Sequence, residues 1–172
     1  RFAPAGATLA VTGFDGAIRV WNLDTNFFAA LTGEATTYGA PAFTPDGRHL
    51  ATCAMNGTAR VWPTPDLRAR VLRGHQAQSP HVRFLPDGRI ASDSDDHTVR
   101  VWDLRRGDSQ IVAHHQDRVY GLTVAPDGRV ADSSFDGVAR VWDPATGTSV
   151  ALTGHTGRVR TVAFMPDGGL VS

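Results

Sequence analysis

Short runs of apolar residues alternate with polar turn residues along the whole chain, without the spacing of an amphipathic helix. Four of these runs end in tryptophan and cover residues 17–21, 58–62, 98–102 and 138–142. They are mostly β-branched, which is typical of strands. Asx-Gly pairs and repeated Pro-Asp-Gly triplets stand at the ends of the runs. These residues favour tight turns, because Pro presets φ and Gly accepts positive φ. The pattern therefore predicts an all-β chain of short strands joined by tight turns.

Three landmarks repeat in one register. The tryptophans at 21, 62, 102 and 142 are separated by 41, 40 and 40 residues. Pro-Asp-Gly recurs at 45–47, 86–88, 126–128 and 166–168, and a pair that is Gly-His in its full form stands at 33–34, 74–75, 114–115 and 154–155. Each unit of about 40 residues holds four short strands, which predicts a blade of a β-propeller. The predicted units are 1–32, 33–73, 74–113, 114–153 and a truncated 154–172.

The combination of Gly-His, Pro-Asp-Gly and Val-Trp-Asp resembles the WD-repeat (WD40) β-propellers over the whole chain. The dipeptide Trp-Asp itself occurs at 102–103 and 142–143, whereas Trp-Asn stands at 21–22 and Trp-Pro at 62–63. The resemblance implies four-stranded antiparallel blades in a ring that usually closes with about seven of them. Because 172 residues make about 4.3 units, we expect an incomplete ring whose first partner is the rest of its own propeller.

The resemblance also implies one buried hydrogen-bonded tetrad per blade, formed by a His, a Ser or Thr, a turn Asp and the Trp. A buried Asp is tolerable only when hydrogen bonds satisfy its oxygens, and His and Ser supply those donors. Carried over by position, the tetrad residues are His75, Ser92, Asp96 and Trp102; His115, Asp132, Asp136 and Trp142, with Asp132 in the place of serine; Glu34, Thr52, Asn56 and Trp62; Asp15 and Trp21; and His155 and Ser172.

In this family, partners usually dock on the face that displays the loop before the innermost strand and the turn after the second strand. The residues at these positions differ between the repeats, and several belong to types that are enriched at interfaces. The predicted partner-binding residues are Phe14, Thr37, Met55, Gln78, Asp95, Arg118, Tyr120, Phe135, Arg158 and Arg160. For Phe14 and Phe135, packing between blades is an equally weighted interpretation.

Chemistry at a catalytic or metal site finds little support in the sequence. His75, Ser92 and Asp96 imitate a Ser-His-Asp triad, but the tetrad interpretation buries all three, and a nucleophile needs access and an oxyanion hole. The acidic run 93–96 lacks the Gly and Glu of a calcium loop. The pair 114–115 has no second ligand pair at metal spacing, and no Gly-rich phosphate loop precedes a helix. We therefore expect no enzyme activity, no metal and no cofactor.

Composition excludes further classes of partner. The 17 acidic and 17 basic residues give zero net charge, which argues against a general polyanion binder, although Arg118, Arg158 and Arg160 are candidates for nucleic-acid contact. The sequence contains no run of 18 consecutive apolar residues, so we expect no membrane partner. One Cys excludes an internal disulfide, and we expect a cytoplasmic protein. All basic residues are Arg, which we interpret as the codon bias of a GC-rich bacterial genome.

The sequence thus favours a non-enzymatic scaffold or sensor that binds a protein or peptide partner on its loop face. The alternative is the C-terminal regulatory propeller of a multidomain bacterial signalling enzyme, such as a kinase, protease or NTPase. Fold alone does not decide between them.

Overall fold

The computed structural model describes residues 1–4, 6–13, 15–32, 39–64 and 68–172. The predicted site residues Phe14, Glu34 and Thr37 lie outside these ranges. Every regular element of the described residues is a β-strand. Within these ranges no helix is long and apolar enough to cross a membrane.

The strands form five antiparallel sheets, which we number as blades 1 to 5 in chain order. Strands that follow one another in sequence pair within each sheet. Blade 1 has β1 (Thr8–Thr12), β2 (Ala17–Asn22) and β3 (Phe27–Thr32); blade 2 has β4 (Ala42–Phe43), β5 (His49–Cys53), β6 (Ala59–Pro63) and β7 (Arg70–Leu72); blade 3 has β8 (Val82–Phe84), β9 (Ile90–Asp93), β10 (Thr98–Trp102) and β11 (Ser109–His114); blade 4 has β12 (Val119–Val124), β13 (Val130–Ser134), β14 (Ala139–Asp143) and β15 (Thr148–Leu152); blade 5 has β16 (Ala163–Phe164) and β17 (Leu170–Val171).

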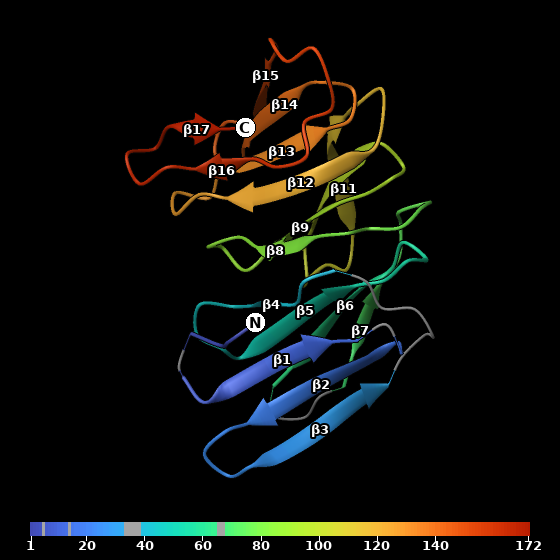
Figure 1. Ribbon diagram of the computed structural model, residues 1–172, viewed down its shortest axis with the longest axis vertical. Helices are drawn as coiled ribbons and strands as arrows, with labels where there is room; N and C mark the ends of the chain where they lie inside the picture. Colours follow the sequence, from blue (N-terminus) through green and yellow to red (C-terminus); the bar gives the residue numbers. More distant parts are fainter. Residues whose placement is uncertain (5, 14, 33–38, 65–67) are drawn as a thin grey trace.

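The blades follow one another along the molecule, with blade 1 at one end and blade 5 at the other (Figure 1). The innermost strands are neighbours, since β8 contacts both β4 and β12, and β12 contacts β16. The Pro-Asp-Gly hairpins lie together on the left of Figure 1, and the loops that lead into the innermost strands β8, β12 and β16 lie on the right. We call these the turn face and the loop face. The arrangement confirms the predicted all-β fold of antiparallel propeller blades.

The core lies between consecutive blades. Trp62, Trp102 and Trp142 each pack in a cluster with apolar side chains of the preceding blade, and each is at most 4% exposed. Trp21 differs, because no preceding sheet covers blade 1 among the described residues; it is half-buried and stacks on Phe28 at 4.7 Å. The Trp side of a blade therefore becomes a core only when another blade packs on it.

The turn between the second and third strands departs from the repeat in blade 3. Asx-Gly pairs make this turn in blades 1, 2 and 4, and Gly137 has a φ of 86° in blade 4. In blade 3, His97 takes the same left-handed conformation with a φ of 71°. A non-glycine residue there is uncommon, and this turn carries Asp95 and Asp96 of the candidate sites.

Candidate functional site

The four predicted tetrad residues of blade 3 come together in one hydrogen-bonded chain. The Trp102 Nε1–H donates to Ser92 Oγ at 2.8 Å, and His75 Nε2 lies 2.8 Å from the same oxygen. His75 Nδ1 lies 2.9 Å from Asp96 Oδ2. Because the indole only donates, the Ser92 hydroxyl accepts from Trp102 and can donate to His75 Nε2. The Nδ1–H of His75 then donates to Asp96.

The carboxylate of Asp96 ties a loop to a turn. Its Oδ2 also accepts the N–H of Gln76 at 2.9 Å, and its Oδ1 accepts the N–H and the hydroxyl of Thr98. Burial alone would raise the pKa of Asp96, but hydrogen bonds from His75, Thr98 and Gln76 outweigh it and lower the pKa strongly. Ser92 is fully buried and therefore inaccessible to a substrate. The geometry is that of a structural clamp.

The tetrad of blade 4 places one histidine between two carboxylates. His115 Nε2 lies 2.7 Å from Asp132 Oδ1, and its Nδ1 lies 3.0 Å from Asp136 Oδ2. Trp142 packs in the adjoining core and, in the part of the chain that the structure describes, makes no hydrogen bond to Asp132. Both ring nitrogens of His115 thus face carboxylate oxygens, which only accept hydrogen bonds, so the cluster needs one additional proton, on His115 or on a carboxylate. Blade 3 needs none, because the Ser92 hydroxyl can donate to His75.

The pKa values agree with an extra bound proton. Burial lowers the pKa of His115, but the hydrogen bond to Asp132 and the charges of Asp132 and Asp136 outweigh it and raise the pKa. Desolvation raises the pKa of Asp132 against the opposing effect of His115. Both shifts describe a folded state that holds a proton more tightly than the unfolded chain does.

We predict that Asp132→Ser reduces the decrease in the free energy of unfolding as the pH rises above neutral. The stabilisation from the raised pKa of His115 is complete below the ordinary value of 6.5 and is lost as pH rises through the raised pKa. The raised pKa of Asp132 likewise makes the folded state less stable as the pH rises. Serine restores the residue of blade 3 and removes the demand for the proton. Urea midpoints from pH 6 to 9 should fall less steeply in the variant.

A suitable control is Asp127→Ser, which removes an exposed carboxylate from the same blade. The pKa of Asp127 is lowered, chiefly by the backbone hydrogen bond from Arg129, so Asp127 does not titrate in this pH window. Equal slopes for wild type and Asp132→Ser above pH 6.5 would contradict the proton-holding role of the cluster.

The remaining tetrads are incomplete. In blade 2, Trp62 Nε1–H donates to Thr52 Oγ1 at 3.4 Å, whereas Asn56 is exposed and accepts from Thr58 instead. In blade 5, His155 Nε2 lies 2.7 Å from Ser172 Oγ, and both residues are exposed.

Blade 1 keeps only the Asp and the Trp of the tetrad positions, as the sequence indicates. Asp15 is exposed and pairs with Arg19 at 2.7 Å, apart from the half-buried Trp21. The physical reason is that no sheet covers this side of blade 1 among the described residues. Asp15 remains hydrated there and needs no His–Ser pair to satisfy its oxygens.

Five side chains form a continuous cluster on the loop face, across blades 3, 4 and 5. The rings of His81 and Tyr120 meet edge to face at 5.8 Å, and the rings of Tyr120 and Phe135 lie 5.4 Å apart. The guanidinium groups of Arg158 and Arg160 lie over the Phe135 ring at 4.9 and 5.9 Å. We call this the Phe135 cluster. Phe135 is half-buried beneath the others, so it both packs between blades and supports exposed side chains.

A second group adjoins this cluster. The Asp95 N–H donates to the Gln78 carbonyl at 2.9 Å, and Arg118 pairs with Asp95 at 3.5 Å. The Phe135 N–H donates to the Arg118 carbonyl at 3.0 Å, which joins the two groups. Burial raises the pKa of Asp95, against the charge of Arg118. Met55 of blade 2 is 41% exposed.

The sequence analysis missed His81 and its partner Asp93. Asp93 is fully buried, and its two oxygens accept from the backbone N–H and Nδ1 of His81, each at 2.8 Å. The signal was available, because the position of Asp93 holds Cys53 in blade 2 and Ser133 in blade 4.

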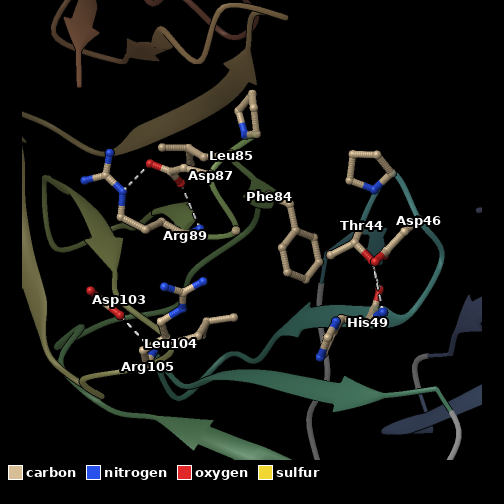
Figure 2. A pocket seen from close by; sticks show the side chains of 13 residues that line it. Thr44, Asp46, His49, Phe84, Leu85, Asp87, Arg89, Asp103, Leu104 and Arg105 are labelled. Carbon is tan, nitrogen blue, oxygen red and sulfur yellow. Dashed lines mark hydrogen bonds and ion pairs between the residues drawn. The ribbon is translucent and has the colours of Figure 1, made fainter. Parts of the chain in front are cut away.

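The turn face has a cleft of about 740 Å³ between blades 2 and 3. Figure 2 shows the Phe84 ring between the Thr44–Asp46 turn and side chains of blade 3. The carboxylates that line the cleft already form hydrogen bonds or ion pairs within the protein. Asp46 accepts from the Thr44 hydroxyl, Asp87 pairs with Arg89, and Asp103 accepts from the backbone N–H of Arg105. The carboxylates of the cleft therefore have partners within the protein.

No group of three metal-ligating side chains occurs in the described ranges. A comparison with curated proteins found no match. The model of the family described as "WD domain, G-beta repeat" matches residues 1–22, 39–63, 68–103, 108–143 and 147–172. These matches cover most of the chain and contain every described strand except β3. The chain therefore belongs to the WD40 repeat family.

Proposed function

We propose that this chain is a non-enzymatic interaction module that binds a protein or peptide partner through its loop face. The observation that carries the proposal is the continuity of the Phe135 cluster with Gln78, Asp95 and Arg118 across three blades. WD40 repeats generally support protein interactions, and aromatic and arginine side chains dominate the binding energy of many interfaces.

The tetrad geometry supports a structural role for the Ser-His-Asp set. Ser92 is buried between an indole and an imidazole, and its hydrogen completes a chain toward Asp96. An acyl-transfer nucleophile requires an open side and oxyanion donors. The same residues instead hold the Gln76 backbone and the Asp95–Asp96 turn in place, which positions Gln78 and Asp95 on the loop face.

The proposal predicts that Tyr120→Ala with Arg158→Ala lowers the affinity for the partner at least tenfold, since truncating each of two interface residues costs about 1–2 kcal/mol. Both side chains are exposed, so the change should leave the fold intact. The measurement is quantitative pull-down with the full-length protein, after matching melting temperatures.

The matched control is Arg105→Ala with Met165→Ala, which removes one exposed arginine and one partly exposed apolar residue from the turn face. Capture should be unchanged in this variant. If the loop-face and turn-face variants recover the same partners in equal amounts, the proposed face is wrong.

A further inference from the structure

Two arginines of the Phe135 cluster have no acidic partner in the described chain. Arg158 and Arg160 are both exposed, and neither forms an ion pair with any residue that the structure describes. They flank Val159, whose side chain is buried and whose N–H donates to the Ser134 carbonyl at 3.0 Å. The loop that carries the two arginines is therefore anchored to blade 4.

The position of these guanidinium groups over Phe135 matters for what they can bind. A guanidinium that lies over a ring uses its face for the contact, and the N–H groups at its edge stay free for a carboxylate. The contact also restricts the long side chain, so less conformational entropy is lost when a ligand binds. Paired N–H donors of this kind match the two oxygens of a carboxylate.

Three carboxylates on the neighbouring strands and turns already have partners within the protein. Asp93 accepts from His81, Asp95 pairs with Arg118, and Asp136 accepts from His115. Among the described residues, no carboxylate compensates the positive charges of Arg158 and Arg160 at the edge of this aromatic surface. Charge complementarity calls for a partner that brings its own acidic groups.

We propose that the Phe135 cluster binds an acidic peptide segment of a protein partner, with Asp or Glu carboxylates on Arg158 and Arg160 and adjacent apolar atoms on Tyr120. This inference rests on the proposed function and adds the chemistry of the partner. A peptide fits better than a nucleic acid because the chain has zero net charge. It therefore lacks the cationic field that binds a long polyanion.

The test is fluorescence anisotropy with the full-length protein and a labelled Glu-Gly repeat peptide, alongside a Gln-Gly peptide of equal length. We expect Arg158→Gln with Arg160→Gln to weaken binding of the acidic peptide roughly tenfold, the scale of two exposed ion pairs. Raising the salt concentration should weaken binding by wild type and have little effect on the double variant. Arg105→Gln, which removes an arginine from the turn face, should bind as wild type does.

Phe135→Leu separates the ring contact from charge, since both arginines remain. We expect a weaker effect of about threefold, from lost preorganisation; unchanged affinity would remove Phe135 from the proposal. Equal affinity for the Gln-Gly peptide, or an equal loss in Arg105→Gln, would overturn the acidic-peptide site. Tighter binding of a single-stranded oligonucleotide with the same number of charges would assign the arginines to nucleic acid instead.

The pull-down experiment keeps the two proposals distinguishable. If loop-face variants lose their partner but the acidic peptide does not bind to wild type, the loop face remains the proposed interaction face, and the proposal of an acidic peptide is wrong. If neither assay responds to the loop-face variants, both proposals fall.

Discussion

Replacing Trp102 with alanine is expected to lower the free energy of unfolding by about 3–5 kcal/mol, the usual cost of deleting a buried aromatic side chain. Trp102 is 2% exposed and packs with side chains of blades 2 and 3. Its loss also removes the hydrogen bond to Ser92 at 2.8 Å. The deletion therefore opens a cavity between blades and leaves the buried tetrad short of one donor.

Urea unfolding of this 172-residue chain, followed by tryptophan fluorescence and circular dichroism, measures this effect. Trp21→Ala is the matched control, because Trp21 stands at the same repeat position but is only half-buried beside Phe28. We expect a much smaller shift in the midpoint for Trp21→Ala. Equal shifts for the two variants would show that burial between blades is not what makes Trp102 important.

Replacing Asp96 with alanine is expected to cost about 3 kcal/mol, because removing a largely buried carboxylate leaves several hydrogen-bond donors without their acceptor. The Asp96 side chain is 9% exposed and lies 2.9 Å from His75 Nδ1. Its oxygens also accept from the backbone N–H groups of Gln76 and Thr98. Alanine would leave these donors without their acceptor at the point where loop and turn meet.

Asp15→Ala provides the comparison for Asp96→Ala, since Asp15 occupies the same repeat position on an uncovered sheet. The carboxylate of Asp15 is exposed and pairs with the exposed Arg19, so its removal should shift the urea midpoint only slightly. Hydrogen exchange of the Gln76 amide should accelerate in Asp96→Ala and stay unchanged in Asp15→Ala. A protected Gln76 amide in Asp96→Ala would argue against the clamp.

The tetrads connect stability with the proposed binding role. In blade 3, Asp96 holds the loop at Gln76, and the next residue pair, Asp95 and Gln78, is joined by a backbone hydrogen bond. In blade 4, Asp136 holds Gln116 in the same way, just before Arg118 and Tyr120. Each clamp therefore fixes the start of a loop whose later residues reach the loop face.

Period and turn chemistry were enough to predict the strands, the blades and the family, because each repeat specifies its strands locally. The set His75, Ser92, Asp96 and Trp102 could be named in advance for the same reason. Loop-face residues were harder to predict, because their contacts come from different blades. Phe135, Arg158 and Arg160 meet only after blades 4 and 5 pack, and the His81–Asp93 pair forms between a loop and a neighbouring strand.

The sequence by itself determined the all-β repeat, since strand propensity and tight turns act over a few residues and recur every 40 or so. It also determined which residues can join a tetrad. Only the tertiary structure decided which tetrads are buried, because burial depends on the neighbouring blade: Trp102 is covered and Trp21 is half-exposed. It likewise decided which arginines remain without a carboxylate, since ion pairing depends on distances between residues far apart in the chain.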